Sequence, residues 1–142
     1  MYQSINLESF VQAAGDAIIA VGSDGKIILW NPAAERIFGF TATDALGQSL
    51  DLIIPERFRP RHWQAYQRVM GTGQTRYGAD VLRVPAVHKD GRALSIAFTV
   101  TLMYSRQRQI DAIVAVIRDE TKRWQEEQAL RKRIAELEAI RH

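Results

Sequence analysis

The apolar and polar positions divide the chain into a hairpin, several short helices, a β-rich second half and a terminal helix. Two apolar runs, Ala17–Val21 and Ile27–Trp30, flank the polar segment Ser23–Lys26. This segment contains Asp24-Gly25, and Asp-Gly between apolar runs predicts a tight β-hairpin because glycine readily adopts a positive φ.

A helix is expected immediately after this hairpin. Asn31 can cap a helix through its side-chain oxygen, and Pro32 suits the first helical position, where no amide hydrogen bond is lost. The pattern predicts a helix over Ala33–Phe38 that ends at Gly39. A capping-box-like start at Thr41 predicts another short turn of helix.

Two further helices are expected before the β-rich half. Residues 4–14 place apolar side chains at helical spacing and predict a short helix that packs on the sheet. Pro60–Met70 predicts the longest interior helix, with glycines at its end. On this helix Trp63 and Tyr66 belong to an apolar stripe, and His62 points towards the apolar side.

The second half is rich in strand patterns. Tyr77–Val87 predicts a strand in which Pro85 indicates an edge or a bulge, and residues 94–103 alternate with period two. Ile110–Arg118 is apolar on both sides, so both faces of the sheet need cover. Interior helices can cover one face; the N-terminal helix, the C-terminal helix or a second subunit must cover the other.

The last segment changes character. Residues 122–142 are charged, lack Gly and Pro, and predict an exit helix. Leu130, Ile134 and Leu137 follow a 4,3 spacing, which is typical of a helix that pairs weakly with its own copy. We therefore divide the chain into an N-terminal flanking helix (1–15), a core (16–120) and a C-terminal coiled-coil-like helix (121–142).

Composition narrows the class of protein. The chain has 142 residues, 46% of them hydrophobic, and no run of 18 apolar residues or basic-then-apolar leader, so we expect a soluble protein kept in the cytoplasm. Zero cysteines exclude disulfides and thiolate metal sites. The net charge of +3 comes from basic residues interleaved with acids, which argues against nucleic-acid binding.

Catalytic signatures are missing from the sequence. There is no glycine-rich phosphate loop, HExxH, GxSxG or kinase catalytic motif. Candidate carboxylates such as Asp51, Glu56 and Asp80 fall in turns or on an edge without a paired base. We expect the protein not to be an enzyme.

The order of these elements indicates an α+β fold with a five-stranded antiparallel sheet flanked by short helices, and it resembles the PAS sensor family. The matching segments are residues 23–31, 33–40, 47–48, 89–91 and 118–121. The resemblance implies a module that binds a ligand or cofactor. It also implies that Arg118, Asp119 and Thr121 pass the signal to the exit helix, and Asp119 and Thr121 match the family's Asp-x-Thr element.

Residues 55–73 are similar to the corresponding helix of haem-binding PAS oxygen sensors of the FixL type. That resemblance implies that His62 is the axial iron ligand of haem b and that Arg68 contacts a haem propionate. The family's distal arginine aligns with Leu82, and Arg83 is one residue away, which reverses its face unless a bulge intervenes. The expected cofactor site comprises His62, Arg68, Leu82, Arg83, Tyr66, Val69, Ile96, Phe98 and Val114.

Alternatives stay open at this point. His62 can instead bond a neighbouring backbone group in a haem-free dimerisation module that holds a small ligand or nothing, and Arg118 and Asp119 can form a simple surface ion pair. A flavin could act in this cysteine-free chain only through redox change. The expected partners are a second copy of the chain, through the flanking helices, and an output domain such as a histidine kinase in two-component regulation.

Overall fold

The computed structural model describes residues 4–73 and 80–141, and it confirms the α+β architecture with one five-stranded antiparallel sheet. The strands are β1 (Ala17–Gly22), β2 (Ile27–Trp30), β3 (Leu82–Val87), β4 (Ala93–Tyr104) and β5 (Ile110–Asp119). The helices are α1 (Leu7–Ala13), α2 (Pro32–Phe38), α3 (Ala42–Ala45), α4 (Arg59–Thr72) and α5 (Thr121–Arg141), with 3-10 turns η1 (Leu50–Ile53) and η2 (Glu56–Phe58).

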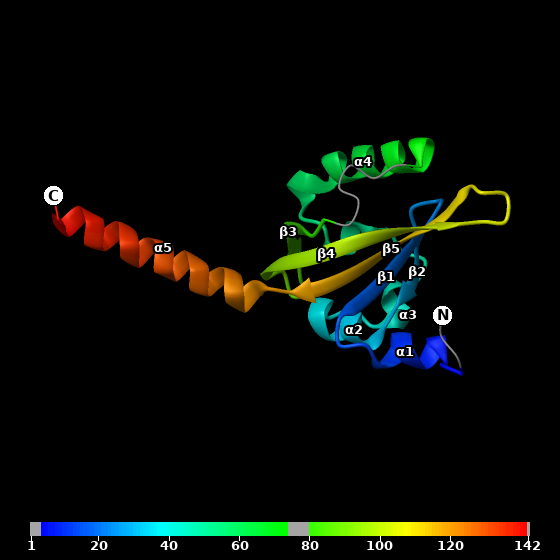
Figure 1. Cartoon of the computed structure of the whole chain (residues 1–142), viewed down its shortest axis with the longest axis horizontal. Helices are drawn as coiled ribbons and strands as arrows, with labels where there is room; N and C mark the ends of the chain where they lie inside the picture. The colour runs from blue at the N-terminus through cyan, green and yellow to red at the C-terminus, as the bar shows by residue number, and fades with distance from the viewer. Residues whose placement is uncertain (1–3, 74–79, 142) are drawn as a thin grey trace.

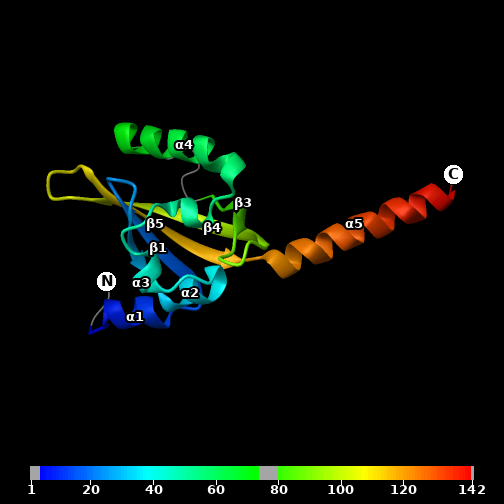
Figure 2. The same ribbon diagram turned by 180° about the vertical axis from the view of Figure 1, so that it is seen from behind.

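The sheet order is β2-β1-β5-β4-β3. The strands β1 and β5, which come first and last in the sequence, are therefore neighbours in the middle of the sheet. Near this sheet, α1, α2 and α3 gather on the β1–β2 side, α4 runs apart from them, and α5 extends away from the domain (Figure 1). The same arrangement is visible from behind, where the β4–β5 hairpin projects at the end opposite α5 (Figure 2).

The predicted turn chemistry is confirmed at the first hairpin and at α2. Gly25 has φ 82°, as the Asp-Gly turn requires. The side-chain oxygen of Asn31 caps α2 by accepting from the backbone N–H of Ala34, Pro32 opens the helix, and Gly39 ends it in the left-handed region.

Register divides the sheet into two faces. The inner face is the one that contributes Ile19, Ile96 and Ile117 to the core, where they pack with helix residues such as Phe38. Antiparallel partners share a face, and Val114 pairs with Ala20 and Thr101 on the opposite, outer face.

The outer face keeps apolar side chains near solvent, with Val116 39% exposed. The helix α1, one of the three alternative covers for this face, packs instead beside α2, where the buried Asn31 Nδ2 donates to the carbonyl of Val11 at 2.9 Å. Phe10 of α1 is 58% exposed. The cover expected for this face is therefore not supplied by α1 in the described chain.

Two boundaries differ from the sequence prediction. The helix α4 runs from Arg59 to Thr72 and includes Gly71, while Gly73 at φ 72° ends it. The strand expected over Tyr77–Val87 begins at Leu82, and the first three residues of that range lie outside the described residues. Pro85 lies on an edge strand, as predicted, but β3 pairs with β4 without a bulge.

Candidate functional site

Two aromatic side chains hold the helix α4, one by a hydrogen bond to the 3-10 turn η1 and the other by a hydrogen bond to the β1–β2 hairpin. Trp63 Nε1 donates to Asp51 Oδ1 at 2.7 Å, and the Tyr66 hydroxyl donates to the carbonyl of Gly22. The two rings meet edge to face, with centroids 5.1 Å apart. At Gly25 an added methyl group would lie 3.3 Å from the Trp63 ring, so the glycine also permits this close approach.

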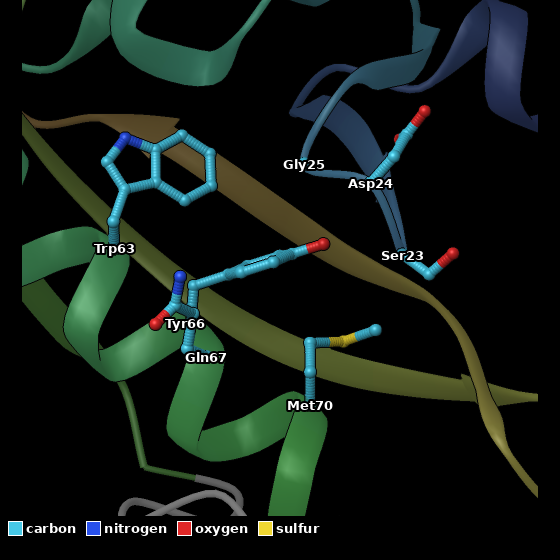
Figure 3. A pocket seen from close by; sticks show the side chains of 7 residues that line it. All are labelled: Ser23, Asp24, Gly25, Trp63, Tyr66, Gln67 and Met70. Carbon is cyan, nitrogen blue, oxygen red and sulfur yellow. The ribbon is translucent and has the colours of Figure 1, made fainter.

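A cleft of about 320 Å³ opens between α4 and the hairpin turn. Figure 3 shows the Tyr66 ring crossing it towards the hairpin, between Trp63 and Met70. The residues that line the cleft are Ser23, Asp24, Gly25, Trp63, Tyr66, Gln67 and Met70. Its walls combine aromatic, thioether and polar groups, so it can hold a small ligand with apolar and polar parts.

His62 lies one residue before Trp63 on α4, outside the set that lines this cleft. Its ring contacts the Trp63 ring edge to face at 4.6 Å, and its Nδ1 atom is buried without a hydrogen-bond partner. Burial lowers the pKa of His62 from its usual 6.5, and the nearby Asp51 carboxylate partly opposes the change. The imidazole is therefore neutral near pH 7, which is the form that binds metals.

The other residues expected around a cofactor divide between the two faces of the sheet. Leu82, Ile96 and Phe98 lie on the inner face by their register. Val69 of α4 is half-buried, and Arg68 is exposed on the solvent side of the helix.

Two residues that the sequence prediction assigned to the cofactor site lie on the other face of the sheet. Val114 lies on the outer face, opposite Ile96 and Phe98, so its assignment to the pocket is wrong. Because β3 has no bulge, Arg83 points to the side opposite Leu82, and its Nε donates to Glu120 Oε2 at 3.3 Å. The assignment of Arg83 to the cofactor site is also wrong.

The junction between β5 and α5 is a dense polar network. Asp119 Oδ1 accepts from the backbone N–H of Thr121 at 2.9 Å and from its hydroxyl, and the hydroxyl oxygen of Thr121 accepts from the N–H of Ser95 at 3.0 Å. The N–H of Glu120 donates to the carbonyl of Ser95 at 2.8 Å. The Asp-x-Thr element therefore begins α5 and fixes it to β4.

Arg118 does not pair with Asp119, contrary to the surface-pair alternative. Its guanidinium donates to both carboxylate oxygens of Asp16, at 3.1 and 3.2 Å. Sequence reasoning missed Asp16 and Ser95 because each becomes a junction residue only through strand pairing.

Two features are absent from the described residues. No cluster of three or more His, Cys, Asp or Glu side chains that could hold a metal ion occurs within residues 4–73 and 80–141. No helix in that part of the chain is long and apolar enough to cross a membrane.

A family model described as the PAS fold matches residues 6–119. The chain belongs to the PAS family. A solved structure agrees with the fold: the PAS domain of a protein from Colwellia psychrerythraea superposes with a TM-score of 0.71 at 22% identity, covering 82% of this chain and 95% of that one.

Three curated relatives of this PAS domain are named as sensors. The sensor protein FixL of Bradyrhizobium diazoefficiens is 39% identical over 57 residues, 40% of this chain. The oxygen sensor protein DosP of Escherichia coli is 23% identical over 58% of the chain, and the sensor histidine kinase TmoS of Ectopseudomonas mendocina is 27% identical over 83% of it. The chain spans 11%, 10% and 12% of the lengths of these relatives, respectively.

Proposed function

We propose that this PAS domain is a sensory module that binds haem b through His62, responds to a diatomic gas and relays the response to α5. The observation that carries the proposal is the His62 imidazole, which is largely buried, neutral and left without a protein partner at Nδ1. A neutral imidazole is a suitable ligand for haem iron.

The relatives support a gas-sensing role. Residues 55–73, which include His62, resemble the corresponding helix of FixL-type haem sensors, and one relative is named as an oxygen sensor. In this assignment Arg68, exposed on α4, would bind a haem propionate, because an arginine guanidinium pairs well with a carboxylate. Because Arg83 pairs with Glu120, we propose no arginine on the side of the haem where the gas would bind.

When bound, haem would supply an iron that holds the gas. The chain's own residues provide the rest of the path. Ile117 of β5 belongs to the core, and Asp119, two residues further on, caps α5 through Thr121. A shift in the packing against β5 therefore has a short covalent route to the start of α5.

The output is proposed to be a histidine kinase in a longer signalling protein, with two copies of the module associated through α1 and α5. One relative is a sensor histidine kinase. The flanking helices keep apolar side chains at the surface, among them Phe10 and Trp124. Such exposed apolar residues are typical of surfaces that bind another protein.

Reconstitution with haem tests the ligand. We expect the wild-type chain to give a visible spectrum with a histidine-ligated iron band, and the His62→Ala variant to lose that band. The matched control His88→Ala removes another half-buried histidine and should keep it. An unchanged iron-ligand spectrum in His62→Ala would reject His62 as the ligand.

A haem-free interaction module is the second candidate. It is favoured by the close contact of Trp63 with the hairpin at Gly25 and by the Tyr66 hydrogen bond, because the chain's own side chains partly fill the space beside α4. The module would then hold a small ligand in the cleft, a flavin working by redox change, or nothing. A purified protein that is colourless and takes up no haem would favour this candidate.

A further inference from the structure

The cleft between α4 and the β1–β2 turn has a lining of one charge sign. It contains one carboxylate, that of Asp24, and no basic side chain. Figure 3 shows the hairpin residues on one side of the cleft and the α4 residues, with the Trp63 and Tyr66 rings and the Met70 thioether, on the other. A ligand that enters this space therefore meets a negative charge beside aromatic and thioether groups.

The Asp24 carboxylate keeps acceptor sites for a ligand. Its Oδ1 atom accepts from the backbone N–H of Lys26 at 3.1 Å, and Asp24 forms no ion pair with another of the described residues. An ionised carboxylate offers about four acceptor sites, so most of them remain free. Burial raises the pKa of the Tyr66 hydroxyl above its usual value, the Gly25 N–H partly opposes this rise, and the Asp24 charge adds to it. The field of Asp24 therefore reaches the α4 side of the cleft.

We propose that the cleft binds a small organic ammonium ion, with its charge at Asp24 and its apolar body against Trp63, Tyr66 and Met70. An ammonium N–H donates to a carboxylate in a charge-assisted hydrogen bond. Aromatic rings attract organic cations, and a methionine side chain adapts to apolar bodies of different shapes. Each group that lines the cleft thus has a counterpart in such a ligand.

A metal ion fits this lining less well. Ca²⁺ and Mg²⁺ take about six or more oxygen ligands, and the cleft provides one carboxylate. Over residues 4–73 and 80–141 there is no cluster of three or more His, Cys, Asp or Glu side chains. The mixture of one carboxylate with aromatic and thioether groups therefore favours an organic cation.

The ligand would contact two elements at once. Its partners come from the β1–β2 turn and from α4, so it binds most tightly when α4 lies against the turn. A ligand that binds one form of an equilibrium increases the population of that form. Binding should therefore hold α4 in place and slow hydrogen exchange of its amides. This inference deepens the second candidate function, in which a small ligand occupies the cleft, and does not depend on haem.

Titration of the full chain with three compounds of similar size tests the charge of the ligand. Phenethylammonium carries a positive charge, 2-phenylethanol is neutral, and phenylacetate is negative. Calorimetry should show phenethylammonium binding about tenfold more tightly than 2-phenylethanol, and phenylacetate should bind more weakly than both. Equal binding of the ammonium and the alcohol, tighter binding of phenylacetate, or no binding of phenethylammonium would overturn the proposal.

Asp24→Asn tests the residue that would hold the charge. Asparagine keeps an oxygen for the Lys26 N–H, and Asn-Gly suits the same tight turn, so the hairpin is retained. We expect phenethylammonium to bind about fivefold more weakly, and 2-phenylethanol to bind as before. Glu138→Gln removes an equal charge from the exposed helix α5 and should have no effect. An equal loss in Glu138→Gln, or no loss in Asp24→Asn, would contradict the assignment.

A gain of affinity provides a second test, because misfolding does not explain a gain. Gln67→Glu adds a carboxylate to the lining of the cleft and should tighten phenethylammonium binding about threefold or more. Gln64→Glu adds the same charge to α4 at an exposed position outside the lining and should change the affinity less. No gain in Gln67→Glu, or an equal gain in Gln64→Glu, would count against the site.

These outcomes are distinguishable from failure of the second candidate function. Haem uptake through His62 would reject that candidate, and the titrations would still decide whether the cleft binds an ammonium ion. If the protein takes up no haem and 2-phenylethanol binds as tightly as phenethylammonium, the ammonium assignment fails and the second candidate stands.

Discussion

The helices α2 and α4 pack beside the same sheet but are held in different ways. The shorter helix, α2, has 7 residues and buries Ala33, Ala34 and Phe38 completely or nearly so. The longer helix, α4, has 14 residues and buries none of them. Length therefore does not measure how firmly a helix belongs to this domain.

Side-chain size and capping explain the contrast. Two adjacent alanines let α2 approach the sheet closely, and the buried Asn31 connects its start to β1 and α1. In α4 the bulky Trp63 and Tyr66 make the contacts, each through one hydrogen bond. Elements with few buried contacts open at low free-energy cost. We infer that α4 is the element that a ligand can move, and that α2 is part of the fixed frame.

The largest expected effect is at Asn31. Its side chain accepts from the N–H groups of Ile18 and Ala34 and donates to the carbonyls of Val11 and Asp16. Asn31→Ala leaves these backbone groups buried and without the hydrogen bonds that Asn31 provides. We expect the unfolding free energy measured in urea to fall by roughly 3 kcal/mol or more. Asn6→Ala, which removes an exposed cap from α1, should cost only about 1 kcal/mol. Equal losses would remove the basis of the contrast.

Gly39, at the end of α2, comes next. It has φ 85°, and an added methyl group would lie 2.5 Å from His88 Cε1. Gly39→Ala combines an unfavourable backbone conformation with this clash, so we expect a loss of about 1–3 kcal/mol in unfolding free energy. Gly47 has a similar φ of 84° with nothing within 4 Å, so Gly47→Ala measures the backbone cost alone. A smaller loss at Gly39 than at Gly47 would contradict the packing described here.

Tyr66→Phe should have a smaller and more local effect. Loss of the hydrogen bond to Gly22 should lower the unfolding free energy by about 0.5–1.5 kcal/mol. Hydrogen exchange should speed up for the amides of α4 and remain unchanged for those of α2. The control Tyr104→Phe removes an exposed hydroxyl contact to Gly73 and should leave most of α4 as it was. Uniform loss of protection in both helices would mean that α4 does not open separately.

The smallest effect concerns pH. Burial lowers the pKa of His62 below 6.5, whereas in the unfolded chain it titrates near that value. The unfolded chain then binds more protons between the two pKa values, so the contribution of His62 to stability is complete above about pH 6.5 and is lost as pH falls from there through the lower pKa of the folded state. His62→Gln should flatten this dependence in urea unfolding between about pH 5 and 8. An unaltered pH profile in His62→Gln would exclude His62 as its source.

The sequence predicted most of the fold where the cause is local. An Asp-Gly turn, the Asn31-Pro32 start and the Gly39 stop depend on neighbours in the chain, and each is found where expected. Which residues share a face depends on strand pairing instead. In β5 the side chains on both faces of the strand are apolar. The alternation of residues along the strand therefore does not predict that Val114 lies on the outer face.

The candidate site was predicted less completely for the same reason. His62 was identified from its helix, and its burial agrees with the expected apolar side. Arg83 was misplaced because its direction depends on whether β3 contains a bulge, and only pairing with β4 decides that. Asp16 pairs with Arg118, and Glu120 pairs with Arg83. The two residues of each pair lie far apart in the sequence, so no local pattern connects them.

The geometry of α5 has a mechanical consequence. A helix of 21 residues is about 30 Å long. With one end fixed at Thr121 and the other free of the domain, it acts as a lever arm. A tilt of roughly 5° at the base moves the far tip by roughly 2.5 Å, about half a helical turn. Atomic shifts too small to rearrange the sheet are thereby converted into larger displacements at the far end of α5.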